Sequence, residues 1–211
     1  MDILHSSDGT LFTRSFAPGT RVYGERLHTF DNAEYREWSP KRSKLSAYLT
    51  LKGKEMPIKS DSRVLYLGAA SGTTASHVSD LVPDGVVYCV EFSQRTFRDL
   101  VAVCGQRKNM IPLLGDATQP DSFGFAVDNV DVVYQDVAQK SQHKILADNM
   151  EKFSARHGML ALKSRSEDVT AYPEKIIDNA KKGLKERDLT VLDCIRLDPY
   201  EKDHAMIVVR R

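Results

Sequence analysis

The alternation of apolar strand-like runs with helical segments after Ser62 is the feature that most limits how this chain can fold. Such alternation is typical of a parallel sheet with helices on both faces. Right-handed crossovers then give a doubly wound, Rossmann-like α/β fold. The strands are expected at 64–67, 86–90, 110–114, 130–135 and 159–162, and the helices at 74–82, 94–106, 142–154 and 173–185.

The last two predicted strands, 190–197 and 205–209, are joined by the short loop 198–204. A connection this short holds no crossover helix, so we expect the two strands to pair as an antiparallel hairpin. The fold class predicted is therefore α/β, with a doubly wound sheet and an antiparallel last strand. Ligands of such folds bind at the carboxyl ends of the strands.

The N-terminal residues follow a different pattern. Short alternating runs at 11–13 and 21–23, separated by Pro18-Gly19, predict short strands joined by turns. Ser39-Pro40 predicts an N-cap and the first turn of a helix over 41–51. We therefore expect a small β-rich subdomain with an entry helix over residues 1–55, and the main domain over residues 56–211.

Charge is balanced overall but uneven along the chain. With 30 Lys and Arg against 29 Asp and Glu, the formal net charge of +1 indicates no partner. Between Pro40 and Lys59, however, there are six cations and a single anion, Glu55. A local basic surface attracts polyanions, although an ordinary solvated surface has the same composition.

Several classes of protein are disfavoured by composition. The cysteines Cys89, Cys104 and Cys194 lie far apart without C-x-x-C or His-rich spacing, so we expect reduced thiols and no metal site. No apolar run approaches the roughly 18 residues of a membrane span. The N-terminus lacks the layout of a signal peptide. These features favour an intracellular protein that does not span a membrane.

A glycine-containing loop follows the first main-domain strand: Gly68-Ala69-Ala70-Ser71-Gly72-Thr73-Thr74. Small residues let the backbone approach a ligand, which makes Gly68, Ala69 and Gly72 candidate cofactor contacts, although a turn without a ligand has the same sequence. Glu91 ends the next strand, at the spacing from which an acid accepts the ribose hydroxyls of an adenosine cofactor. The loop lacks G-x-G-x-x-G, which favours S-adenosyl-L-methionine over a nicotinamide cofactor.

Further ionisable residues follow the other strands. Asp116 follows the third strand, where it can accept from an adenine amino group, and Asp136 follows the fourth, beside the reactive end of the cofactor. Lys44, Lys163 and His204 are expected to converge with Asp136. Cations near a developing alkoxide stabilise it, and a lysine beside another cation can act as a base. Taken singly, each of these residues fits an ordinary surface or packing role at least as well as a catalytic one.

Longer segments resemble the fibrillarin family, the 2′-O-methyltransferases of box C/D guide ribonucleoproteins. The resemblance covers about residues 24–209 and is carried by residues 35–45, 64–80, 90–92, 136–139, 162–166 and 197–206. It implies a methyltransferase domain that binds S-adenosyl-L-methionine, and a catalytic set of Lys44, Asp136, Lys163 and His204. The cofactor contacts it implies are Thr73, Thr74, Glu91, Phe92, Asp116, Ala117, Asp136, Val137, Ala138 and Gln139.

The resemblance also implies partners: a box C/D guide RNA, a target rRNA or tRNA, a Nop-domain scaffold protein and a kink-turn-binding protein. The Gly/Arg-rich region of eukaryotic members is missing, so we expect an archaeal-type member and a cytoplasmic location. An enzyme delivered to its target by a complex need not grip RNA strongly. The isolated chain is therefore predicted to bind RNA weakly and in a salt-sensitive way.

Three other functions remain open at this stage. A stand-alone RNA or small-molecule O-methyltransferase would methylate its substrate without guide RNA or scaffold. A non-catalytic cofactor-binding subunit of an RNA–protein complex would be insensitive to the loss of Lys163. A nicotinamide oxidoreductase would differ from both in the cofactor that it binds.

Overall fold

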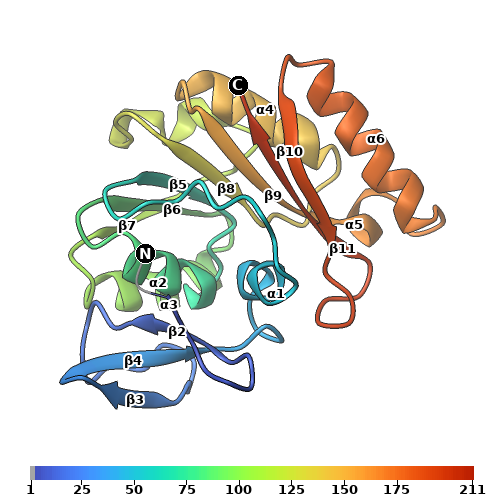
Figure 1. The fold of residues 1–211 in the computed structure, drawn as a ribbon. Coiled ribbons are helices and arrows are strands. Elements are labelled where there is room, and N and C mark those ends of the chain that lie inside the picture. The colour runs from blue at the N-terminus through green and yellow to red at the C-terminus, as the bar shows by residue number, and fades with distance from the viewer. Residues whose placement is uncertain (1–2) are drawn as a thin grey trace.

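Two β-sheets form the frame of this computed structural model, which describes residues 3–211 (Figure 1). The small sheet is antiparallel, has the order β1-β2-β4-β3, and consists of β1 (Ile3–His5), β2 (Leu11–Arg14), β3 (Leu27–Phe30) and β4 (Ala33–Trp38). The large sheet has seven strands in the order β10-β11-β9-β8-β5-β6-β7.

The large sheet confirms the predicted fold class. Its five parallel strands are β5 (Arg63–Leu67), β6 (Val86–Glu91), β7 (Met110–Leu114), β8 (Val132–Gln135) and β9 (His157–Lys163). The last strand, β11 (His204–Arg210), pairs antiparallel with both β9 and β10 (Thr190–Arg196). The chain order reverses between β5 and β8, so the site is expected at their carboxyl ends.

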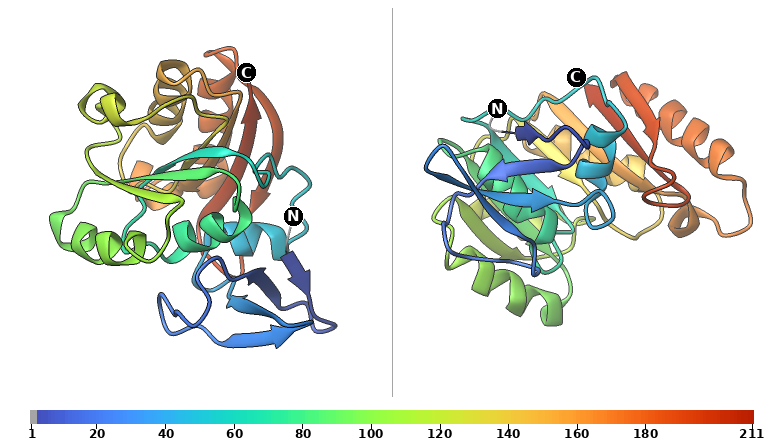
Figure 2. Two further views of the ribbon diagram at one scale, coloured as in Figure 1. Left: turned by 90° about the vertical axis from the view of Figure 1, so that its left-hand side faces the viewer. Right: turned by 60° about the horizontal axis from the view of Figure 1, so that its bottom comes forward.

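Helices cover both faces of the large sheet (Figures 1 and 2). On one face lie α1 (Lys44–Thr50), α2 (Thr73–Leu81) and α3 (Gln94–Cys104). On the other lie α4 (Gln142–Lys152) and α6 (Pro173–Lys185), with α5 (Ser164–Glu167) and the short turns η1 (Pro120–Ser122) and η2 (Gly124–Ala126) in the connections. Successive strand residues alternate between the two cores, as the pleat requires: Val64 packs on the α2 side and Leu65 on the α4 side.

The predictions for the N-terminal segment are partly wrong. The run 11–13 lies within β2, but 21–23 is a bend in which the backbone N–H groups of Val22 and Tyr23 donate to the Glu25 carboxylate. This local carboxylate satisfies donors that a strand would give to a neighbour. The sequence also did not predict β1, β3 or β4.

The entry helix begins later than predicted. Its N-cap is Ser43, whose hydroxyl accepts from the Ser46 N–H at 3.3 Å, while Ser39-Pro40 belongs to the preceding turn. Both serines are good caps. The choice between them is made by packing, because Ser43 is buried and also receives a hydrogen bond from Thr74 Oγ1 at 3.1 Å.

A buried charged cluster joins the small sheet to α2. The Arg36 guanidinium binds Glu25 Oε1 and Asp80 Oδ2 at 2.7 and 2.8 Å, and Arg107 Nη1 lies 2.7 Å from Asp80 Oδ1. Burial, followed by the charges of Arg36 and Arg107, holds the pKa of the neighbouring His77 well below its usual value. The small sheet is therefore anchored to the helix that begins at the glycine loop.

Candidate active site

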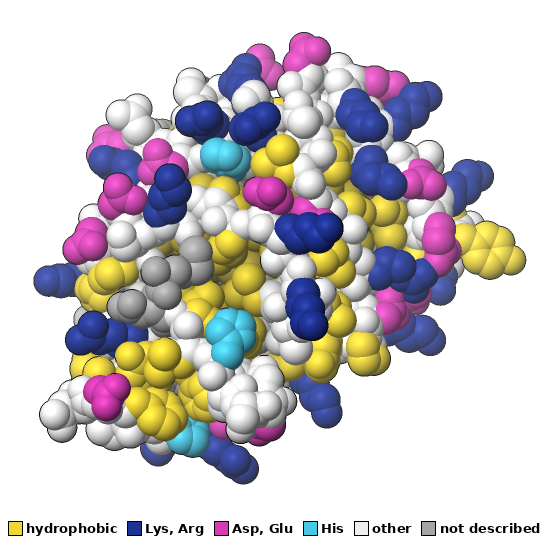
Figure 3. All heavy atoms as spheres, viewed as in Figure 1, with side chains coloured by type: hydrophobic (Ala, Val, Ile, Leu, Met, Phe, Trp, Pro, Cys, Tyr) yellow, Lys and Arg dark blue, Asp and Glu magenta, His cyan; other side chains and the backbone are white. Residues whose placement is uncertain are grey.

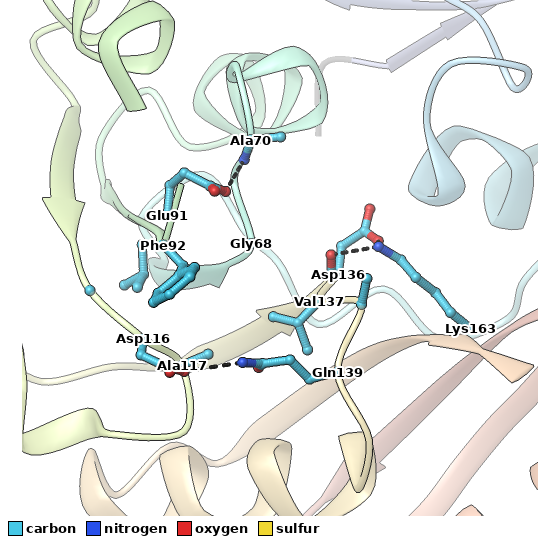
Figure 4. A pocket seen from close by; sticks show the side chains of 13 residues that line it. Gly68, Ala70, Glu91, Phe92, Asp116, Ala117, Asp136, Val137, Gln139 and Lys163 are labelled. Atoms are coloured by element: carbon cyan, nitrogen blue, oxygen red, sulfur yellow. Dashed lines mark hydrogen bonds and ion pairs between the residues drawn. The ribbon is translucent and has the colours of Figure 1, made fainter. Parts of the chain in front are cut away.

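A cavity of about 330 Å³ opens at the carboxyl ends of β5, β6, β7 and β8 (Figure 4). These are the strand ends at which the sequence predicted a ligand. Its walls are formed by Gly68, Ala70, Val90, Glu91, Phe92, Gly115, Asp116, Ala117, Asp136, Val137, Ala138, Gln139 and Lys163.

Gly68 brings the glycine loop against the end of β8. Its φ of +80° favours glycine, and a Cβ atom at this position would lie 2.7 Å from the carbonyl oxygen of Asp136. The loop then turns so that the Ala70 N–H donates to Glu91 Oε2 at 2.8 Å (Figure 4). The absence of a side chain at Gly68 thus sets the distance between two walls of the cavity.

Glu91 and Asp116 present carboxylates that are held by their neighbours. Glu91 Oε1 accepts from the Ser93 N–H and the Thr96 hydroxyl at 2.8 and 3.0 Å. Burial raises the pKa of Asp116, but hydrogen bonds from Thr118 and Gln139 outweigh it, so the net effect lowers that pKa. Both groups are oriented acceptors for hydroxyl or amino donors.

The remaining walls suit a flat apolar group. The Phe92 side chain is 69% exposed, and Figure 4 shows its ring between the side chains of Glu91 and Asp116. Ala117 and Val137 contribute apolar surface to the same cavity. Two fixed carboxylates beside an exposed aromatic ring fit an adenosine, whose base stacks and whose hydroxyl and amino groups donate.

Asp136 lies between two lysines at the mouth of this cavity. Lys44, the first residue of α1, approaches Asp136 Oδ2 at 3.2 Å. Lys163, the last residue of β9, has its Nζ 2.9 Å from Asp136 Oδ1 and also donates to the Asp136 carbonyl at 2.9 Å (Figure 4). All three side chains are largely buried, with 13–19% exposed. Two cations and one anion therefore converge as predicted, from segments far apart in the chain.

Lys163 is held by a residue that the sequence reading missed. Gln142, in the first turn of α4, is fully buried; its Oε1 accepts from the Lys163 N–H at 2.9 Å and its Nε2 donates to the Lys163 carbonyl at 3.1 Å. Glu167 in turn accepts from the backbone N–H groups of Ser141 and Gln142. Nothing in the sequence distinguishes this glutamine from a polar residue at a helix start.

His204 stands apart from the cluster in its hydrogen bonding. It is paired in register with Lys163 on β11 and β9, but its Nδ1 lies 2.7 Å from the Lys202 carbonyl oxygen. A carbonyl oxygen only accepts, so Nδ1 carries the proton and Nε2 can accept. Within residues 3–211, no hydrogen bond or ion pair joins the His204 side chain to Asp136 or Lys163.

Four predicted cofactor contacts lie outside the lining of the cavity. Ala69 and Thr74 are buried, and Gly72 packs beneath Leu100 and Val103 of α3. Thr73 lines a different cavity. The other predicted contacts all line the first cavity: Gly68, Glu91, Phe92, Asp116, Ala117, Asp136, Val137, Ala138 and Gln139. Ala70, Val90 and Gly115 also line it. The sequence pointed to these three residues only because each is next to a predicted cofactor contact.

Known proteins match this chain along nearly its whole length. A family model described as Fibrillarin matches residues 3–211. The fibrillarin-like rRNA/tRNA 2′-O-methyltransferase of Methanopyrus kandleri is 49% identical over 199 residues, covering 93% of this chain and 86% of the relative. The solved structure of the Methanococcus jannaschii fibrillarin pre-rRNA processing protein has a TM-score of 0.94 and 41% identity, covering 99% of this chain and 94% of its own.

Two further solved structures contain a ligand or a partner. The Aeropyrum pernix fibrillarin in complex with natively bound S-adenosyl-L-methionine has a TM-score of 0.88 and 44% identity, covering 98% of this chain and 92% of its own. A fibrillarin/Nop5p complex has a chain with a TM-score of 0.90 and 42% identity, covering 100% of this chain and 97% of its own.

Proposed function

This chain belongs to the fibrillarin family, and on that premise we propose that it is the catalytic subunit of a box C/D ribonucleoprotein. It transfers a methyl group from S-adenosyl-L-methionine to ribose 2′-hydroxyl groups of rRNA and tRNA, at positions chosen by a guide RNA. The observation that carries the proposal is the Lys44–Asp136–Lys163 cluster at the mouth of a cavity that fits an adenosine.

Different residues of the cavity hold different parts of the cofactor. Glu91 accepts from the ribose hydroxyls, Asp116 accepts from the adenine amino group, and Phe92 covers the face of the base. When bound, the cofactor supplies an activated methyl group on its sulfonium. The Asp136 end of the cavity is where that group meets the substrate, because Asp136 lines the cavity and carries the two lysines.

The lysine–aspartate cluster handles the proton of the 2′-hydroxyl group. The hydroxyl donates its hydrogen to a carboxylate oxygen of Asp136, which orients it. The ammonium groups of Lys44 and Lys163 hold the Asp136 carboxylate in place through their ion pairs. Because a hydroxyl becomes strongly acidic as its oxygen is alkylated, the carboxylate can accept the proton late in the reaction. Alignment by Lys44, Asp136 and Lys163 supplies the rest of the rate enhancement.

The assembly and the location are proposed by analogy with the family. A Nop-domain scaffold protein is the proposed direct partner, supported by the fibrillarin/Nop5p complex. The guide RNA and a kink-turn-binding protein complete the particle, which acts in the cytoplasm. No helix in residues 3–211 is long and apolar enough to cross a membrane. We also propose two domains: of the described residues, 3–55 contain the small sheet and α1, and 56–211 contain the methyltransferase sheet.

The test is transfer of labelled methyl from S-adenosyl-L-methionine to a target RNA, with the modified ribose mapped. The chain is assayed alone and with guide RNA plus the two partner proteins. We expect transfer only in the full assembly, and a loss of about 100-fold or more with Lys163→Ala. Lys59→Ala is the matched control, because Lys59 is exposed and precedes the amino end of β5, whereas the cluster lies at the carboxyl ends of the strands.

Each other result contradicts part of the proposal. Transfer by the isolated chain would make it a stand-alone methyltransferase. Cofactor binding without transfer in either arm would make it a non-catalytic subunit. Full activity of Lys163→Ala in the assembly would remove the lysine–aspartate cluster from the chemistry.

A further inference from the structure

A second cavity, of about 480 Å³, lies between the loop that joins β2 to β3 and helix α3. Arg21 and Tyr23 reach it from the loop between β2 and β3, and Arg42 reaches it from the turn before α1. Thr73 and Asp99 line it from α2 and α3. We propose that this cavity binds the phosphate backbone of the RNA strand that carries the target ribose, an inference that rests on the proposed function.

The two arginines of this cavity are available to a ligand. Both are exposed, and within residues 3–211 neither forms an ion pair with a carboxylate, unlike Arg36, Arg107 and Arg196. The Arg42 guanidinium lies over the Tyr23 ring, 5.6 Å from its centroid. This cation–π contact holds the guanidinium near the ring without using its N–H donors. Such a fork matches the oxygens of a phosphodiester.

The cavity is tied to the catalytic cluster by one short segment, Arg42-Ser43-Lys44. Ser43 is buried, caps α1 and accepts from Thr74 Oγ1, so this segment is held firmly against the end of the glycine loop. Two residues span at most about 7 Å. An RNA strand whose ribose lies at Lys44 and Asp136 therefore reaches Arg42 with the nucleotides next to the target.

The charges that line the cavity favour weak RNA binding, which suits a strand that the assembly brings to the site. Asp99 shares the cavity and forms no ion pair among the described residues. Its carboxylate repels phosphate and reduces the attraction of the two arginines. On the face drawn in Figure 3, lysines and arginines are interspersed with acidic residues over much of the surface. Weak phosphate contacts of this kind set the register of an RNA without specifying its sequence.

The test measures binding of the full-length chain to a short fluorescent single-stranded RNA by anisotropy over a range of salt concentrations. Each phosphate contact on a single strand contributes about 0.7 to the slope of log K against log salt concentration. We expect the Arg21→Ala/Arg42→Ala double variant to bind more weakly, with a slope shallower by about 1.4. Asp99→Asn is expected to bind RNA more tightly than the wild type.

Arg156→Ala is the matched control, because Arg156 is exposed and precedes β9, at the opposite end of that strand from Lys163. The affinity for S-adenosyl-L-methionine and the thermal midpoint, measured for every variant, show whether the fold is intact. Equal salt slopes for the double variant and Arg156→Ala, with RNA affinity unchanged in Asp99→Asn, would overturn the inference. The inference would also be overturned if an acidic peptide bound the wild type through both arginines while the affinity for RNA was the same in all the variants.

The same variants in the assembled particle separate this inference from the proposed function. We expect the double variant to raise the KM for target RNA while the control does not. If the wild-type particle transfers methyl groups and the KM is unchanged in the double variant, the proposed RNA-binding role of the cavity is refuted and the proposed function stands. If no methyl group is transferred but RNA binding depends on the two arginines, the proposed function is refuted and the RNA-binding role of the cavity stands.

Discussion

At the scale of single residues, the site depends on how the backbone around each reacting group is held. Lys163 ends a buried strand, and its N–H and carbonyl groups both bind the Gln142 side chain. That arrangement fixes the base of a long flexible side chain whose ammonium group must reach Asp136. A small shift in such a group is costly, because a misplacement of about 1 Å can cost about 100-fold in rate.

We predict that Gln142→Met lowers kcat for methyl transfer by about 10- to 100-fold, because methionine fills the same space but cannot hold the Lys163 backbone. The affinity for S-adenosyl-L-methionine should change little, since Gln142 does not line the cofactor cavity. Single-turnover rates in the assembled particle and calorimetric titration of the cofactor measure the two quantities. Gln94→Met, at an exposed position, is the control. An equal loss of cofactor affinity and rate would indicate general disruption instead.

His204 is a predicted catalytic residue whose side chain forms no hydrogen bond or ion pair with the lysine–aspartate cluster among residues 3–211. The family resemblance places it with Lys44, Asp136 and Lys163, and the β9–β11 register does bring it opposite Lys163. Its side chain nevertheless binds the Lys202 carbonyl. Its catalytic role stays a prediction, with a free Nε2 as the atom that could act.

At the scale of secondary-structure elements, the glycine loop is the element whose geometry matters most to the cavity. Gly68 and Gly72 both have positive φ values, of 80° and 90°. The sequence indicated this loop from its small residues. It could not indicate that Gly68 is needed for an approach to Asp136, or that Gly72 packs beneath α3, because both neighbours come from other segments.

We predict that Gly68→Ala weakens cofactor binding by at least 10-fold and destabilises the fold by more than the cost of positive φ alone. The new Cβ would meet the Asp136 carbonyl at 2.7 Å and push two cavity walls apart. Gly9→Ala is the matched control, because Gly9 has a φ of +86° with nothing within 4 Å of its Cβ position. That control should lose only about 1–2 kcal/mol of unfolding free energy. Equal effects of the two substitutions, measured by urea unfolding and cofactor titration, would contradict the clash.

At the scale of the whole molecule, a buried polar interface joins the small sheet to the large domain. His77 stacks on Trp38 with ring centroids 4.9 Å apart, and its ring nitrogens bind the hydroxyl groups of Tyr23 and Thr13. Arg36 and Asp80 complete the interface beneath it. Because His77 is on α2, loss of this interface would disturb the helix that follows the glycine loop.

This interface predicts a pH dependence of stability. The pKa of His77 is held well below 6.5 in the folded chain, so below about pH 6.5 the unfolded chain binds a proton that the folded chain does not. Stability from this group is therefore complete above pH 6.5 and declines as the pH falls, by up to about 1.4 kcal/mol per unit. Urea unfolding from pH 7.5 to 5.5 should show a steeper decline in the wild type than in His77→Gln. Parallel declines would mean that other groups dominate.

The order of strands and helices after Ser62 could be predicted from sequence because each element leaves a local pattern. Buried strands appear in the sequence as short apolar runs. Pro173 marks the start of α6, which spans Pro173–Lys185. The N-terminal strands were harder to predict. The run 11–13 lies in β2, but 21–23 forms no strand, because the Glu25 carboxylate accepts from its backbone N–H groups. Ser43 rather than Ser39 caps α1 for the same reason, because burial selects between equivalent caps.

Sequence by itself determined the fold class, the family and the residue types at each strand end, because these follow from local periodicity and from motifs read along the chain. Tertiary structure alone decided which of those residues meet. Lys44 and Asp136 are 92 positions apart and Asp136 and Lys163 are 27 apart, yet their charged groups lie within 3.2 Å. It also decided that Gln142 holds Lys163 and that Arg21 joins Arg42, since contacts between distant segments depend on crossovers and packing that no local pattern records.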